Sequence, residues 1–157
     1  MTLDLQTGEE AVRIEGDQLV VRLADIDDYE RKKMLIETFV WEQCQTLFTR
    51  LVEELTPKLA CYDVEMPKVR LRRMKTRWGS CSPARRSISL NMKLLETAPG
   101  CIEYVVLHEL CHFVHPNHSK AFYALLERLM PDWKERKQAL DQRERQLAEG
   151  ISPLVVT

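Results

Sequence analysis

The chain has 157 residues, of which 45% are hydrophobic, and a formal net charge of −1 at pH 7. This length allows one hydrophobic core, and no repeat or low-complexity tract interrupts it, so we expect a single domain over residues 1–157. Residues 1–17 begin with acids where a secretion signal would be basic and then apolar, and no apolar run is long enough to cross a bilayer, so we expect a cytoplasmic protein with no membrane partner.

Residues 1–60 predict a β-hairpin followed by a long helix. In "AVRIEGDQLVVRL" (residues 11–23), β-branched residues lie on both sides of the turn signal Glu15-Gly16-Asp17. From Asp27 or Asp28 to Leu55, apolar residues recur at helical spacing after an acidic start, and Pro57 ends the pattern. We expect this helix to pack in a core rather than to carry chemistry.

The next segment predicts two strands separated by a loop. "PKVRLRRMKTRW" (residues 67–78) alternates as a strand does, and the slip at Arg72-Arg73 is typical of a bulge. "GSCSPARR" (residues 79–86) has the glycine, proline and serines of a loop, in which we expect Gly79 to allow a tight bend. "SISLN" (residues 87–91) favours a short strand.

Basic residues dominate the same segment. Between Glu65 and Glu96 there are nine bases and no acid, whereas residues 1–66 carry 15 acids and 7 bases. A block of one sign can attract an anionic partner, such as a nucleic acid or a nucleotide, through residues 68–93. The alternation in "KVRLR" is equally typical of the solvated face of a half-buried strand, so both interpretations stay open. The nine bases are Lys68, Arg70, Arg72, Arg73, Lys75, Arg77, Arg85, Arg86 and Lys93.

Helices are predicted for the rest of the chain, which makes the fold class α+β. Residues 100–114 are apolar around nearly the whole circumference of a helix, so this helix should be buried. Pro116-Asn117 ends it, and a further helix begins near residues 117–119. That helix is interrupted at Pro131-Asp132 and resumes from Trp133 to Gly150. We expect residues 61–149 to form the core and the C-terminal helices around it.

All four histidines of the chain lie between His108 and His118. His108 and His112 are four residues apart, so they share one face of a helix and can bind one metal ion, with Glu109 beside them. Burying these groups without a partner would cost several kcal/mol, and a zinc ion would satisfy them. The H-E-x-x-H pattern therefore predicts a Zn²⁺ site in which Glu109 activates a zinc-bound water.

The third ligand has two candidates. His115 lies on the same helix face, but a rise of about 1.5 Å per residue places it roughly 10 Å from His108 along the axis. The turn at Pro116-Asn117 can bring His118 back over the ion, so we choose His118. His115 is then a group near the metal, a polar residue at the rim of the cleft, or a cation at the helix C-terminus.

Cysteines are not expected to bind the metal. The five cysteines are an odd number and form no CxxC pair, which argues against disulfides and a cysteine zinc site and favours buried thiols. Cys111 lies within the histidine motif but on a different helix face from the ligands.

Four motifs in this order carry a family resemblance: "RWGSC" (residues 77–81), "ISLN" (residues 88–91), "YVVLHELCH" (residues 104–112) and "NHSKAF" (residues 117–122). Over residues 60–140 the chain resembles the YgjP-like metallopeptidase family, a relative of the SprT-like zinc proteases. The resemblance implies a zincin-like minimal core, zinc held by His108, His112 and His118, and Glu109 as catalytic base. It also implies that the "ISLN" strand beside the metal helix pairs with an extended peptide. The pattern differs from that of metzincins, which have a glycine where this chain has His115.

Three functions remain open at this stage. The first is peptide hydrolysis at the zinc ion, and the second is zinc-dependent hydrolysis of nucleotides or another anionic small molecule by the same site. The third is a structural zinc site or a nucleic-acid-associated protein, for which an open three-ligand site is less suited. Further groups that could assist the metal or the substrate are Arg77, Asn91, His115 and Tyr123.

Overall fold

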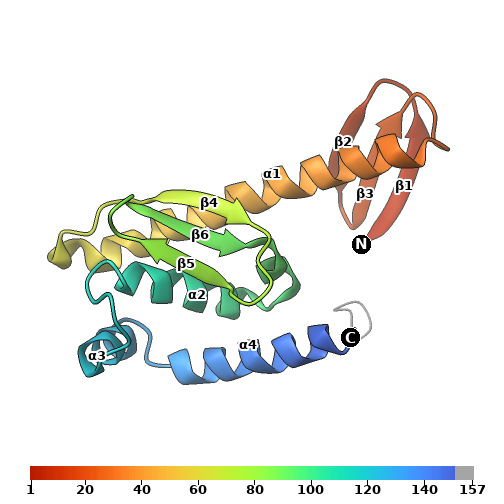
Figure 1. Cartoon of the computed structure of the whole chain (residues 1–157). Helices are drawn as coiled ribbons and strands as arrows, with labels where there is room; N and C mark the ends of the chain where they lie inside the picture. The colour runs from red at the N-terminus through yellow and green to blue at the C-terminus, as the bar shows by residue number, and fades with distance from the viewer. Residues whose placement is uncertain (151–157) are drawn as a thin grey trace. The chain divides into compact units, whose positions relative to one another are not determined.

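The structure is a computed structural model that describes residues 1–150, and it confirms the α+β class (Figure 1). Two compact units divide the chain, Met1–Cys44 and the part that begins at Gln45. Each unit contains one three-stranded sheet. No helix of the described part is both long and apolar enough to span a membrane. That the whole chain acts as one domain stays a prediction.

The first unit contains the predicted hairpin and one more strand. Strands β2 (Ala11–Glu15) and β3 (Gln18–Leu23) pair antiparallel, as predicted. Strand β1 (Thr2–Thr7) was not predicted, and it pairs parallel with β3, so the sheet order is β1-β3-β2. Val20 and Val21 on β3 are fully buried, because this strand has a partner on each side.

Helix α1 (Tyr29–Leu55) confirms the long helix of the sequence analysis. The Asp28 carboxylate accepts a hydrogen bond from the backbone N–H of Arg31 at 3.0 Å, which satisfies a free donor of the first turn. At the other end the chain tightens into the 3-10 helix η1 (Thr56–Tyr62), whose second residue is Pro57. In the second unit, Phe48 and Val52 of α1 are fully buried.

The second sheet differs from the prediction in two places. Its strands are β4 (Lys68–Arg72), β5 (Gly79–Ser82) and β6 (Ser87–Asn91), in the order β4-β6-β5. The strand predicted over residues 67–78 ends at Arg72, and its pairing with β6 contains no bulge. Beyond Arg72 the chain leaves the sheet, and the Asn91 side chain donates hydrogen bonds to the carbonyls of Met74 and Arg77 in this segment.

The predicted loop over residues 79–86 is also wrong in its first half. Residues 79–82 form β5, which pairs antiparallel with β6, and only the following residues make the turn. The central strand β6 is confirmed, and all five of its residues are buried because β4 and β5 flank it.

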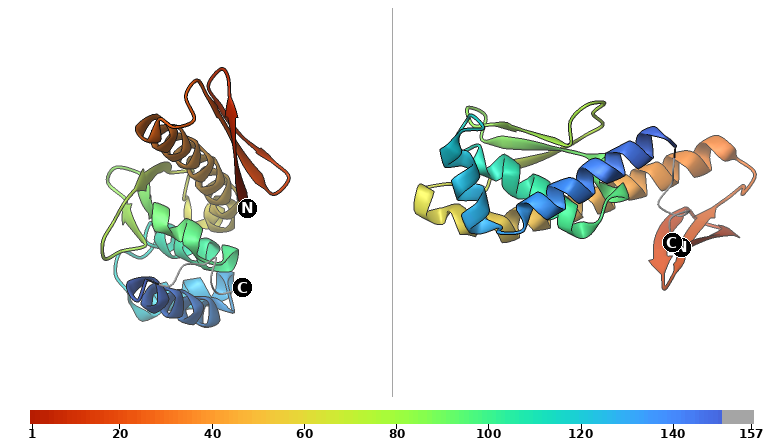
Figure 2. Two further views of the ribbon diagram at one scale, coloured as in Figure 1. Left: turned by 90° about the vertical axis from the view of Figure 1, so that its right-hand side faces the viewer. Right: turned by 90° about the horizontal axis from the view of Figure 1, so that it is seen from below.

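Helix α2 (Pro99–Cys111) lies between this sheet and helix α4 (Trp133–Ala148) (Figures 1 and 2). Its burial confirms the prediction, but it ends three residues early, because the N–H groups of residues 112–114 bond to carbonyls three residues back. The 3-10 helix η2 (Met92–Glu96) joins β6 to this region, and helix α3 (Lys120–Leu129) follows the histidine loop. Ser119 caps α3 by accepting a hydrogen bond from Phe122 N at 3.2 Å.

Candidate metal centre and cleft

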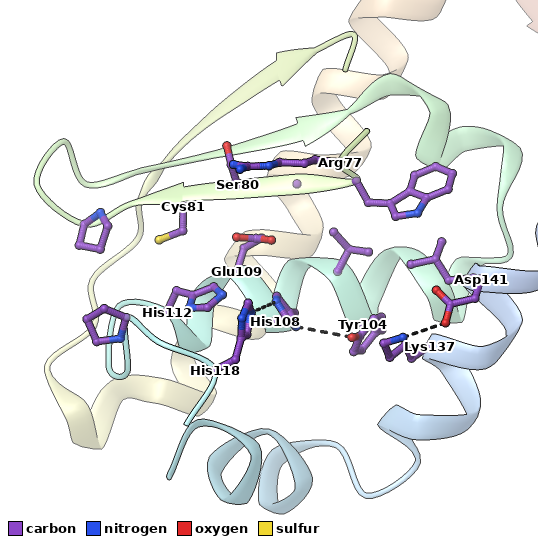
Figure 3. Close-up of a pocket in the computed structure, with 16 residues that line it drawn as sticks. Arg77, Ser80, Cys81, Tyr104, His108, Glu109, His112, His118, Lys137 and Asp141 are labelled. Atoms are coloured by element: carbon purple, nitrogen blue, oxygen red, sulfur yellow. Dashed lines mark hydrogen bonds and ion pairs between the residues drawn. The ribbon is translucent and has the colours of Figure 1, made fainter. Parts of the chain in front are cut away.

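Three histidines form a cluster at the end of α2. His108 and His112 come from the last turn and cap of this helix, and His118 comes from the loop before α3 (Figure 3). One ring nitrogen of each lies within 4.8 Å of the other two. The Nε2 atoms of His108 and His118 are 3.2 Å apart. This spacing suits three imidazoles around one small ion, which is the donor set of many catalytic zinc sites.

Neighbouring groups orient two of these rings. His112 Nδ1–H donates to the backbone carbonyl of His115 at 3.1 Å, because a carbonyl can only accept. The Tyr104 hydroxyl lies 3.5 Å from His108 Nδ1. In both rings Nδ1 is therefore engaged and Nε2 is free for an ion. His115 contributes its main chain here, and its imidazole is not part of the cluster.

Aromatic rings support the cluster from behind. The Phe122 ring lies 5.0 Å from His108, 4.6 Å from His112 and 5.1 Å from His118, measured between ring centroids. Tyr123 stacks on His118 with centroids 6.2 Å apart. Because all three rings rest on one fully buried phenylalanine, their positions are fixed by packing before any ion binds.

Glu109 lies beside the histidines but faces the sheet. It is 7% exposed, and burial raises the pKa of its carboxyl to about 7, while nearby Arg77 opposes this shift. Gly79 makes this burial possible: a Cβ atom at Gly79 would lie 3.1 Å from Glu109 Cγ and 3.1 Å from Val105 Cγ1. The backbone of Gly79 needs no left-handed conformation, so the expected tight bend is wrong and close approach to α2 is the reason for a glycine.

Two of the clustered histidines, His108 and His112, favour their neutral forms. Burial, followed by the neighbouring His112 and His118, lowers the pKa of His108 to about 4. Burial also lowers the pKa of His112, against the effect of its hydrogen bond to the His115 carbonyl. Neutral imidazole is the form that binds a metal ion, so the cluster is prepared for one near neutral pH.

A cleft of about 550 Å³ opens onto the histidines and Glu109 (Figure 3). One wall is formed by β5 and by Arg77 and Trp78, which precede it, and the floor is α2. The opposite wall is α4, which contributes Leu140 and the ion pair between Lys137 Nζ and Asp141 Oδ2 at 2.8 Å. The cleft has room for a peptide segment or a small molecule beside the three rings.

The four lower-ranked residues of the sequence analysis lie in different places. Arg77 lines the cleft, whereas Asn91, His115 and Tyr123 do not. Asn91 is 2% exposed and holds the loop before β5: its Nδ2 donates to the carbonyls of Met74 and Arg77, each at 2.8 Å. Its own N–H donates to the Trp78 carbonyl at 2.9 Å. Asn91 therefore fixes the backbone from which the Arg77 side chain extends.

Other cleft residues escaped the sequence analysis. Tyr104 precedes His108 by one helical turn, and this spacing alone could have suggested that the two side chains meet. Lys137, Leu140 and Asp141 are brought to the cleft only by the packing of α4 against α2, which no local pattern predicts.

The strand β6, which was expected to pair with a peptide, has no free edge for it, whereas β5 has one. The segment "ISLN" lies on β6, whose two edges are already paired with β4 and β5, so it has no free edge. Among the described residues β5 has a partner on one side only, and it lines the cleft. Of the nine bases in the basic segment, Arg77 alone lines this cleft.

The chain is similar in structure to two solved metallopeptidase zymogens, and it matches one family model. The zymogen of the metallopeptidase abylysin from Pyrococcus abyssi is 24% identical, with a TM-score of 0.55, over 61% of this chain and 93% of that one, and it supports the fold. The zymogen of the metallopeptidase jannalysin from Methanocaldococcus jannaschii is 23% identical, with a TM-score of 0.47, over 66% and 96%. No curated protein is similar enough to add a relative. The family model described as "YgjP-like, metallopeptidase domain" matches residues 1–143, so the chain belongs to the YgjP-like metallopeptidase family and is a hydrolase of that type.

Proposed function

We propose that this protein is a zinc-dependent peptidase, with Zn²⁺ held by His108, His112 and His118 and with Glu109 as the general base. The observation that carries the proposal is the cluster of three imidazole nitrogens within 4.8 Å of one another, next to a buried carboxyl group. These three histidines would hold the ion and would leave a coordination position for water or substrate, an arrangement typical of catalytic rather than structural zinc.

Zinc, when bound, supplies a positive centre that polarises the scissile carbonyl and makes water more acidic. The Glu109 carboxylate takes a proton from the attacking water and delivers it to the leaving amine. Burial raises the pKa of this carboxyl in the metal-free protein, so its environment favours proton uptake, which a general base needs. The Arg77 guanidinium at the rim stabilises negative charge that develops on the substrate.

We infer that a peptide substrate binds in extended form along β5. This strand is four residues long and has unpaired main-chain groups on the side that lines the cleft. An added strand would gain hydrogen bonds from the backbone irrespective of its sequence, while the walls of the cleft would select its side chains. Tyr104 and Val105 of α2 and Leu140 of α4 are the groups that such side chains would meet.

The variant Glu109→Gln tests the proposal. It should keep one zinc ion per chain and lose cleavage of an unfolded protein such as casein, because the amide cannot accept the proton. Glu127→Gln, which changes an exposed glutamate on α3, is the matched control and should cleave as the parent does. If Glu109→Gln cleaves casein at the parental rate, the assigned mechanism is wrong.

A second candidate is hydrolysis of a nucleotide phosphoanhydride at the same site. The observation in its favour is that two cationic side chains, Arg77 and Lys137, line the cleft beside the histidines. Both could contact phosphate oxygens. Purified zinc protein incubated in parallel with casein and with nucleoside triphosphates would separate the two candidates. Nucleotide turnover no faster than that of the metal-stripped protein would eliminate the second one.

A further inference from the structure

The sheet of the second unit has two chemically different faces. Residues paired across the strands share a face, and one face carries Val69, Leu71, Ile88 and Leu90, which pack toward α2. The opposite face combines alternate residues of β4 with the serines that pair with them. We call this set the basic face, and its members are Lys68, Arg70, Arg72, Ser80, Ser82, Ser87 and Ser89.

No helix of the second unit covers the basic face. In both views of Figure 2, α2 and α4 lie on the same side of the sheet, and α2 contacts β5 and β6 from that side. The side chains of Lys68, Arg70 and Arg72 are exposed. The three cations of the face therefore form a free surface of this unit, whereas Ser87 and Ser89, on the neighbouring strand, are buried.

Within the described part of the second unit, no ion pair neutralises the cations of this face. Among residues 1–150, the nine bases of the segment make a single ion pair, between Arg86 and Glu65 at 3.9 Å, and both of these side chains are exposed. Lys68, Arg70 and Arg72 stand about 6.6 Å apart along one strand, since alternate residues are separated by two rises of about 3.3 Å. Like charges in a row repel one another, so a partner with regularly spaced negative charge would be stabilised here.

The composition of the face favours phosphates over other anions. Arginine and lysine side chains contact phosphate oxygens of nucleic acids, and serine hydroxyls also do so where they are accessible. None of the large exposed hydrophobic residues of the chain lies on the face, so it offers neither an anchor for a membrane nor a pocket for a peptide side chain. It also lacks an aromatic side chain on which an unpaired base could stack.

We propose that the basic face binds the phosphate backbone of a double-stranded nucleic acid without regard to base sequence. The histidines and Glu109 of the cleft belong to α2 and the loop that follows it, and of the basic face only Ser80 also lines the cleft, whereas Lys68, Arg70 and Arg72 do not. The hydrolase would thereby be held close to proteins that occupy the same nucleic acid. The proposal does not rest on the peptidase assignment, since binding is measured without any substrate.

Fluorescence anisotropy of a labelled DNA or RNA duplex, titrated with the full chain, tests the proposal. If three cations each contact a phosphate, affinity falls about 40-fold between roughly 50 and 200 mM salt. The triple variant Lys68→Gln, Arg70→Gln, Arg72→Gln should lose this binding and the salt dependence with it. A duplex of unrelated sequence should bind as tightly as the first.

A matched control separates the face from net charge. Replacing Lys33, Lys58 and Arg145 by Gln removes the same charge from exposed positions elsewhere and should leave duplex binding unchanged. Equal loss of binding in both triple variants would overturn the proposal, as would no duplex binding at low salt. Tighter binding to polyglutamate or to anionic lipid vesicles than to the duplex would overturn the choice of partner.

Discussion

The environment of Glu109 predicts a pH-dependent gain in stability for Glu109→Gln in the metal-free protein. Burial raises the pKa of this carboxyl from 4.5 to about 7. Because the folded-state pKa is the higher one, the parent loses stability as pH rises from about 4.5, where the carboxyl of the unfolded chain ionises, until it levels off above about 7. Gln does not titrate, so its advantage over the parent should grow by about 2.5 kcal/mol between about pH 5 and pH 8.

The assay is denaturant unfolding of both proteins at the two pH values after removal of metal with a chelator. Every other titratable group is present in both proteins, so the difference between the two free energies of unfolding isolates the Glu109 side chain. Glu127→Gln, at an exposed position of α3, is the control for the loss of one carboxylate. If the difference in free energy of unfolding between Glu109→Gln and the parent is the same at both pH values, burial does not raise the pKa of the Glu109 carboxyl, and the reasoning is wrong.

Three further predictions concern groups around the site. Gly79→Ala should lower the free energy of unfolding by about 1–3 kcal/mol and should reduce activity more than zinc binding, because the added methyl group would press against Glu109 and Val105 of α2. Gly100→Ala is the control for the same unfolding assay and should be tolerated, because its added methyl group would have no neighbour closer than 3.6 Å. Asn91→Ala should lower the free energy of unfolding by about 2–4 kcal/mol, because the two hydrogen bonds of a buried amide are lost; an unchanged value would show that water replaces the amide. Tyr104→Phe should weaken zinc binding about tenfold in a competition with a chelator, because the hydroxyl group beside His108 Nδ1 is lost. His115→Ala should not weaken it, because residue 115 contacts His112 through its backbone carbonyl and not through its ring.

The helices and the histidine cluster follow from local rules. The spacing of His108 and His112 and the turn at Pro116-Asn117 are properties of neighbouring residues, and the structure brings these histidines and His118 together. Helix α1 is equally local, since an acidic start, periodic apolar residues and a proline suffice to define it.

Long-range packing explains what the sequence analysis missed. "GSCS" has the composition of a loop, yet it forms β5, because small residues are required where a strand approaches a buried glutamate. The strand β4 ends at Arg72, and the segment that follows is held by the distant Asn91 side chain, which donates hydrogen bonds to the carbonyls of Met74 and Arg77. The contribution of α4 to the cleft depends in the same way on contacts that no window of sequence contains.

The closeness of the three histidines along the chain separates two events in folding. They lie within eleven consecutive residues, and Phe122, on which their rings pack, follows four residues later, so α2, the turn and the start of α3 bring the metal-binding group together at a small cost of loop closure. Glu109 remains in water until β5 docks against α2, and β5 requires its pairing with β6. A newly made chain would thus assemble its metal-binding group before Glu109 is enclosed, and it would become competent for hydrolysis only when the distant parts of its own fold are complete.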